Sequence, residues 1–248
     1  MPRFFVKASQ IGVRDDGRKT VLIIGDDALH ITKSLRMKPG ETLCVCDMAR
    51  CEYDCSVISV GEEVLLLVED ERPCDTEPPY EVTLYQALVK GDKFDTVVQK
   101  AVECGVHRIV PFITDRCVVR LSKSDCEKKR LRWQRICAEA AKQCGRGIIP
   151  EVSGLLTFSE MLVEAGQADV PLFCYEGESA VTVPEALKSE SDVKTLSVVI
   201  GSEGGFSVSE AEDAQRSGLL SVGLGRRILR TETASGFVLA CISYEFEL

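Results

Sequence analysis

IGSEGGF at residues 200–206 and LGRRILRTETA at residues 224–234 are the stretches that decide the fold of this chain. Each follows a short apolar segment of strand length, at 196–201 and 219–225. Adjacent glycines lack Cβ atoms, so their backbone N–H and C=O groups can approach a ligand closely. One such loop is most often an ordinary tight turn. Two of them after consecutive strands leave two interpretations open, plain turns or a ligand site at the carboxyl edge of a parallel sheet.

Strands and helices alternate on both sides of these loops. We expect strands at 82–89, 108–113, 170–175, 196–201 and 219–225, and helices from Asp92 to Gly105, at 124–144, 158–165 and 208–217, and from about Glu232. Ser207 and Glu210 have the spacing of a capping box. The last helix is expected to bury one face, made of Ala234, Phe237, Val238, Cys241 and Ile242. The pattern predicts an α/β domain with a largely parallel sheet.

The first third of the chain has a different pattern. Segments 21–25, 41–47, 51–60 and 63–69 are β-branched or alternating and indicate a small barrel-like β module with one short helix near 26–36. The stretch ERPCDTEPPYE (71–81) contains three prolines and four acidic residues, which is typical of a linker. We therefore expect one domain at residues 1–72 and a second at 76–248.

The charge of the chain is unevenly distributed. Thirty Lys and Arg against 39 Asp and Glu give a net charge of -9, which taken whole argues against a nucleic-acid partner. Residues 90–146, however, contain fourteen basic and seven acidic residues. In the helix expected at 124–144, Leu131, Ile136 and Ala140 should face inward and leave a run of Lys and Arg in solvent. Such a run is usually a solvated face, but this excess of basic charge also suggests a surface that binds phosphates.

Several common site types do not fit the sequence. The loop at 223–228 lacks the third glycine of the dinucleotide fingerprint, no P-loop motif is present, and His30 and His107 lack the setting of a catalytic triad. Cys44, Cys46, Cys51 and Cys55 do not have the spacing of paired zinc knuckles, so we interpret them as core cysteines and expect no metal. The opening lacks a signal sequence, and no apolar run reaches the roughly 18 residues of a membrane span, which predicts a cytoplasmic protein with reduced thiols.

Motifs along the whole chain carry a family resemblance. They are PRFFV (2–6), HITKSLRMKPGE (30–41), ALVKGDKFDTVVQKAVECGV (87–106), TDRCV (114–118), RICAEAAKQCGR (135–146), IGSEGGFSVSE (200–210) and LGRRILRTETA (224–234). This ordered set resembles the RsmE-type 16S ribosomal RNA uridine-N3 methyltransferases of the SPOUT superfamily. The resemblance implies a PUA-like β-barrel that binds RNA, followed by an α/β knot domain whose parallel sheet carries a trefoil knot. It further implies a homodimer that binds S-adenosylmethionine among the knot loops and acts on 16S rRNA of the small ribosomal subunit.

The resemblance also implies roles for particular residues. The cofactor-binding set is Leu172, Phe173, Cys174, Ile200, Gly201, Ser202, Glu203, Gly204, Leu224, Gly225, Ile228, Leu229 and Ala234. Arg230 is expected to polarise the uracil or contact its phosphate, and Glu203 or Glu232 to accept the N3 proton or to orient that arginine. The basic residues within the motifs, expected to contact RNA phosphates, are Arg3, Arg36, Lys90, Lys100, Arg116 and Arg146.

Four alternatives stay open at this stage. Arg230 and Glu232 could form a merely structural ion pair. The chain could be a SPOUT methyltransferase for another RNA, such as tRNA, or an RNA-binding homologue without activity. A nicotinamide-dependent oxidoreductase is the remaining class, and it predicts stabilisation by NADH instead of S-adenosylhomocysteine.

Overall fold

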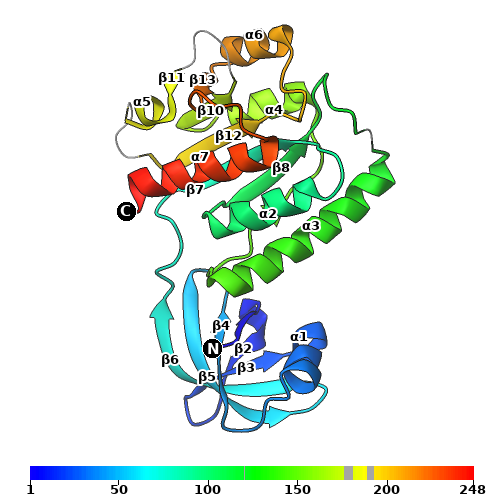
Figure 1. Cartoon of the computed structure of the whole chain (residues 1–248). Coiled ribbons are helices and arrows are strands. Elements are labelled where there is room, and N and C mark those ends of the chain that lie inside the picture. The colour runs from blue at the N-terminus through cyan, green and yellow to red at the C-terminus, as the bar shows by residue number, and fades with distance from the viewer. Residues whose placement is uncertain (120, 176–180, 189–192) are drawn as a thin grey trace. The chain divides into compact units, whose positions relative to one another are not determined.

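A computed structural model describes residues 1–119, 121–175, 181–188 and 193–248 (Figure 1). The chain forms two compact units, which are considered separately. Unit 1 comprises Met1–Glu77 and Ala141–Ile149, and unit 2 comprises Pro78–Ala140 and Pro150–Leu248. Arg120, one of the fourteen basic residues counted above, lies outside the described residues.

Unit 1 is built on a curled six-stranded sheet in the order β1-β4-β5-β6-β3-β2 (Figure 1). Its strands are β1 (Arg3–Phe5), β2 (Ile11–Val13), β3 (Lys19–Ile23), β4 (Thr42–Cys46), β5 (Cys51–Val60) and β6 (Val64–Pro73). β1 and β4 are parallel, and the other neighbouring strands are antiparallel. One face buries an apolar core that includes Phe4, Val21, Leu43, Val45 and Leu66. The predicted β module is therefore present, but β6 continues through Arg72 and Pro73, where a linker was expected.

Short helical segments complete unit 1. They are the 3-10 turn η1 (Ala8–Gln10), α1 (Gly25–Leu29) and the π-helical turn η2 (His30–Ser34). α1 and η2 together form the helix expected near 26–36, and Ala28 and Ile31 anchor them in the core. Cys44, Cys46 and Cys55 are buried, and all twelve cysteines are unbridged.

Unit 2 contains a seven-stranded sheet in the order β11-β13-β10-β12-β7-β8-β9, and every neighbouring pair is parallel. Its strands are β7 (Glu81–Ala87), β8 (Arg108–Phe112), β9 (Glu151–Val152), β10 (Val170–Cys174), β11 (Val181–Thr182), β12 (Thr195–Ile200) and β13 (Leu220–Gly223). The five strands expected from the sequence form its centre. β9 and β11 extend it at the two edges.

The helices of unit 2 are α2 (Lys93–Glu103), α3 (Lys123–Cys144), α4 (Phe158–Ala165), α5 (Val183–Lys188), α6 (Val208–Arg216) and α7 (Thr231–Phe246); the last turn of α3 belongs to unit 1. α2 buries the apolar face that its sequence predicts. Ser207 and Glu210 form the predicted capping box of α6. α7 packs against α2, α5 and β12, and Figure 1 shows α2 and α7 side by side over the sheet. The final helix therefore returns from β13 to the centre of the domain.

Two predicted helix faces are wrong in part. In α3 the side chain of Leu131 is exposed and Ile136 is half-buried, whereas Trp133 and Cys137 are buried, because Trp133 stacks on Phe94 of α2 at a centroid distance of 4.0 Å. In α7 Phe237 is exposed, whereas Ser235 and Leu239 are buried together with Val238 and Ile242. The reason is that α7 contacts three elements and so buries more than a single stripe.

None of the helices in the described residues combines the length and the apolar composition that a membrane span needs. Likewise, no group of three or more His, Cys, Asp or Glu side chains in the described parts of the chain is placed to hold a metal ion.

Candidate functional site

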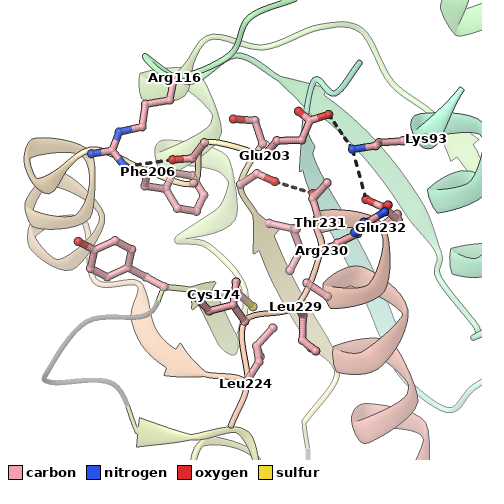
Figure 2. Close-up of a pocket in the computed structure, with 18 of the residues that line it drawn as sticks. Lys93, Arg116, Cys174, Glu203, Phe206, Leu224, Leu229, Arg230, Thr231 and Glu232 are labelled. Atoms are coloured by element: carbon pink, nitrogen blue, oxygen red, sulfur yellow. Dashed lines mark hydrogen bonds and ion pairs between the residues drawn. The ribbon is translucent and has the colours of Figure 1, made fainter. Parts of the chain in front are cut away.

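A cavity of about 590 Å³ lies where the carboxyl ends of β10, β12 and β13 meet α7 (Figure 2). Its walls come from the two glycine-rich loops, with further side chains from the loop after β8, from the end of β10 and from the start of α2. The ligand-site interpretation of these loops therefore gains support, since parallel strands place their ligands at this edge.

The first wall is the loop Ile200–Phe206, in which the glycines are sterically required. A Cβ atom on Gly201 would lie 3.1 Å from the Phe206 ring and 3.2 Å from Cα of Gly205. On Gly204 it would lie 3.0 Å from Cβ of Arg116, and Gly205 has a φ angle of +65°. Because these glycines have no Cβ atoms, the backbone of the loop lies in direct contact with its neighbours, and backbone atoms face the cavity.

A buried hydrogen-bond network joins this loop to the start of α7. The hydroxyl of Thr231 donates to the carbonyl oxygen of Gly201 at 2.7 Å. The same hydroxyl accepts a bond of 2.9 Å from Nε2 of Gln86, a fully buried residue on β7. Three elements distant in sequence are thereby fixed around the cavity.

Apolar residues line one part of the cavity wall. Ile200, Val222, Leu224 and Leu229 face the cavity, together with Cys174 at the end of β10. Burial raises the pKa of the Cys174 thiol, which therefore stays neutral and acts as a small apolar side chain. This part of the cavity suits a flat apolar ring system.

Charged side chains are concentrated near α2. Oε1 of Glu203 accepts hydrogen bonds of 3.1 Å from the backbone N–H of Lys90 and from Nζ of Lys93. Burial alone would raise the pKa of Glu203, but these bonds and its own backbone N–H outweigh that effect and lower the pKa. Glu203 is therefore ionised at neutral pH and already holds several donors.

Glu232 and Arg230 stand on the other side of Lys93 (Figure 2). Oε2 of Glu232 is buried, lies 4.0 Å from Nζ of Lys93 and has no hydrogen-bond partner among the described residues. Arg230 is exposed on the cavity rim. Within the described chain Arg230 forms no ion pair with Glu232. The structure therefore does not support the alternative in which these two residues form a structural ion pair.

The structure brings most of the expected site residues together. Those that line the cavity are Cys174, Ile200, Gly201, Ser202, Glu203, Gly204, Leu224, Ile228, Leu229, Arg230, Glu232 and Ala234. Leu172 and Phe173 were expected in the wall, but both side chains are fully buried within the sheet, and Phe173 instead supports Phe206 at a centroid distance of 4.3 Å. Gly225 is absent from the lining of the cavity in the described structure; its φ of +97° makes it a turn residue.

Sequence reasoning missed six lining residues: Lys93, Tyr175, Gly205, Phe206, Val222 and Thr231. Three of them directly adjoin predicted positions and Phe206 and Val222 lie two residues from one, so extension of each motif by a residue or two would have found these five. Lys93 belongs to the motif KGDK (90–93), from which only Lys90 was predicted to have a functional role.

The six basic residues expected at RNA are placed very differently. Arg116 lines the cavity and donates to the carbonyl oxygen of Gly204, and Arg36 and Lys90 are exposed. Lys100 is exposed and pairs with Glu103 at 2.8 Å.

Arg3 and Arg146 do not fit the expected RNA contacts. Arg146 is 4% exposed and paired with the buried Glu77 at 2.7 Å, and Arg3 is paired with the buried Glu52 at 2.7 Å. These two side chains are held inside unit 1 by carboxylates, which corrects their assignment to an RNA surface.

Comparisons with known proteins give the family of this chain. Residues 76–243 match the family described as an RNA methyltransferase domain. The chain is 33% identical over 253 residues, covering 100% of this chain and 98% of the other, to the ribosomal RNA small subunit methyltransferase E of Bacillus subtilis. The chain belongs to this family. A second relative of the same name, from Mesomycoplasma hyopneumoniae, is 31% identical over 98% of this chain and 99% of its own.

Solved structures of the family superpose on the whole chain. The methyltransferase E of Neisseria gonorrhoeae bound to S-adenosylmethionine has a TM-score of 0.83 at 28% identity, with 99% of this chain and 98% of that chain covered. A putative methyltransferase of Legionella pneumophila with bound S-adenosylmethionine has a TM-score of 0.86 at 28% identity and the same coverage. The fold is thus the α/β knot class of the SPOUT methyltransferases with an amino-terminal PUA-like β-barrel.

Proposed function

We propose that this protein is an S-adenosylmethionine-dependent methyltransferase that acts on N3 of a uridine in 16S rRNA of the small ribosomal subunit. The observation that carries the proposal is the cavity at the carboxyl edge of the parallel sheet, in a chain of this family whose solved relatives bind S-adenosylmethionine. The proposed division of labour is a PUA-like RNA-binding domain at 1–72 and a methyltransferase domain at 76–248.

The residues around the cavity fit the cofactor. Adenine is flat and largely apolar, and the wall of Ile200, Val222, Leu224 and Leu229 offers a matching surface. The glycine loop presents backbone donors and acceptors for the polar groups of the cofactor. Oγ of Ser202 is buried and lacks a hydrogen-bond partner within the described residues, as expected of a group that pairs with a ligand.

The chemistry requires an oriented methyl donor and a base. When bound, S-adenosylmethionine supplies a methyl group on a sulfonium, which needs no metal to react with a nitrogen nucleophile. Arg230 on the rim is placed to hold the uracil or its phosphate, and Glu203 and Glu232 are the carboxylates within the cavity. Because N3 of a paired uridine is engaged in its base pair, we infer that the target is unpaired or flipped out.

Basic side chains that bind RNA phosphates would complete RNA recognition. The proposed contacts are the exposed Arg36 in unit 1 and Lys90, Lys100 and Arg116 in unit 2, and we withdraw the half-buried Arg3 and the buried Arg146 from this set. The direct test of the function is transfer of a tritiated methyl group to small subunits purified from cells that lack the protein, followed by nucleoside analysis. The expected product is 3-methyluridine; label in another nucleoside, or in tRNA alone, would contradict the proposal.

We also propose that the protein is a cytoplasmic homodimer joined through α7. This helix is apolar on more than its buried side, since Phe237 and Tyr244 are exposed and Cys241 is half-buried between them in sequence. These residues lie four and three positions apart and so share one face, where a second copy of the same helix would cover them. Light scattering should give twice the mass of the 248-residue chain, and Phe237→Glu should give a monomer. A monomeric wild-type protein at micromolar concentration would contradict the dimer.

A further inference from the structure

Lys93 occupies a position between the two carboxylates of the cavity. It is the first residue of α2, and its ammonium group lies 3.1 Å from Oε1 of Glu203 and 4.0 Å from Oε2 of Glu232. The two glutamates come from different elements, the loop after β12 and the start of α7 (Figure 2). One lysine therefore links both walls at the end of the cavity away from the apolar surface.

The two glutamates are not equivalent. Glu203 accepts hydrogen bonds from a backbone N–H and from Lys93, and its pKa is lowered although burial acts in the opposite direction. A carboxylate that already holds these donors is a weak proton acceptor. Its geometry suits an anchor for Lys93.

Glu232 has the opposite character. Its side chain is 19% exposed, and in the described structure Oε2 receives no hydrogen bond, with Lys93 at 4.0 Å as its nearest cation. A carboxylate oxygen buried without a donor is costly unless a ligand supplies one. The N3–H group of a uracil is such a donor.

We propose that Glu232 accepts the N3 proton of the target uridine and that Lys93 is the positioning residue that holds this carboxylate in place. This inference rests on the proposed function and deepens it. The bond that forms joins N3 to the methyl carbon, the bond that breaks joins that carbon to sulfur, and sulfur keeps the electron pair. The proton leaves N3 for the Glu232 carboxylate, so that charge and atoms balance without a further reactant.

Other charged groups near this end of the cavity act on the same proton. Arg116 from the loop after β8 and Arg230 before α7 contribute positive charge, and Glu203 contributes negative charge. Cys174 and Tyr175 are the remaining titratable lining residues in the described chain, and α5, although packed on α7, supplies none there. Lys93 is nevertheless the cation whose ammonium is paired with both glutamates.

The test is a pH–rate profile for single-turnover methyl transfer to small subunits that lack the modification, with the cofactor Kd measured by calorimetry for each variant. Glu232→Gln should lower the rate at least about 100-fold, with the cofactor Kd unchanged. It should also remove the acidic limb of the profile, which is the fall in rate at low pH. Lys93→Met should move that limb to higher pH, because loss of a nearby cation disfavours the carboxylate, and Lys93→Arg should restore it. Glu203→Gln should slow the reaction but keep the limb.

Two controls outside the cavity separate these effects from general damage. Lys188→Met on α5 and Glu212→Gln on α6 change exposed residues of the same types and should leave both the rate and the profile unchanged. A Glu232→Gln protein with the wild-type profile, or loss of the limb in Glu203→Gln alone, would overturn the assignment of Glu232. If Lys93→Met lowers the rate without a shift of the limb, the role of Lys93 is refuted. A wild-type protein that binds the cofactor but methylates no small subunit would instead refute the proposed function.

Discussion

The exposed Arg230 has a proposed role in the reaction that can be tested separately from protein stability and from cofactor binding. It lines the cavity and precedes α7, yet its side chain does not cap that helix. Its loss should therefore affect the substrate more than the fold. The apolar wall and the glycine loop, which would hold the cofactor, lie elsewhere in the cavity.

Arg230→Ala is expected to lower methyl transfer by about 100-fold to 1000-fold, because a fixed cation that stabilises developing negative charge is removed. Cofactor binding should survive. Tritium transfer to small subunits and calorimetry with S-adenosylmethionine measure the two effects separately. Arg216→Ala, which removes an exposed arginine of α6, is the matched control, and equal activity of the two variants would contradict the role of Arg230.

For single residues, the sequence predicted where the site lies better than it predicted which side chains interact there. Glycines and their neighbours are visible as motifs, because a loop that needs Gly201 and Gly204 tolerates few other residues. The pairing of Lys93 with Glu203 joins residues 110 positions apart, and no local pattern predicts such a contact. Arg3 and Arg146 show the converse, because a basic residue in a motif does not reveal whether a buried carboxylate faces it.

Among the elements, β7, β12 and α7 are fixed to one another by the Thr231 hydroxyl. Thr231→Val removes the bond to Gly201 and leaves Nε2 of the buried Gln86 without this acceptor. We expect a loss of about 1 to 3 kcal/mol in the free energy of unfolding, and weaker cofactor binding because the glycine loop loses its anchor. Denaturant titration and calorimetry measure both, and Thr42→Val, which replaces an exposed threonine on β4, is the control. A variant as stable as the wild type would show that this network is not what holds the loop.

The carboxyl-terminal turn of α3 depends on a buried ion pair in unit 1. Burial would raise the pKa of Glu77, but hydrogen bonds from Arg146 and from the N–H groups of Gly147 and Ile148, with the nearby charge, lower it below its ordinary value of 4.5. The folded chain therefore binds this proton more weakly than the unfolded chain. The resulting stability is present above the unfolded pKa and is lost as the pH falls through the folded pKa.

The expected result is a decline in the free energy of unfolding below pH 4.5 that is steeper in the wild type than in the double variant Glu77→Gln, Arg146→Met. The double variant is chosen because removal of one partner alone would leave a buried charge unpaired. Denaturant titrations at several acidic pH values give the comparison. Identical slopes for both proteins would show that the pair does not contribute to acid sensitivity.

The element boundaries also show how far sequence patterns reach. The central strands of unit 2 follow from apolar runs of strand length, and β5 of unit 1 follows from a β-branched or alternating pattern. β9 and β11 have two residues each, too few for any periodic signal. The inward face of α3 was misjudged because Trp133 packs on Phe94, a tertiary contact that overrides the position of Leu131 in the pattern.

For the whole molecule, the net charge of -9 conceals the basic residues through which we propose it binds RNA. Affinity for RNA should fall steeply with salt, and each phosphate contact that is lost should reduce the slope of log K against log salt by about 0.7 to 1. Arg36→Gln and Lys90→Gln should each remove one phosphate contact and reduce the slope by the amount for one contact. Lys188→Gln, an exposed lysine outside the proposed surface, should leave the slope unchanged. A flat plot for the wild type would contradict an electrostatic RNA surface.

The measurement that tests the central claim most directly is mass mapping of 16S rRNA from cells that lack this protein. The account predicts the loss of one methyl group from one uridine. It also predicts that the wild-type chain restores this methyl group, whereas the Glu232→Gln variant does not. An unchanged set of methylated nucleotides in the 16S rRNA of those cells would contradict it.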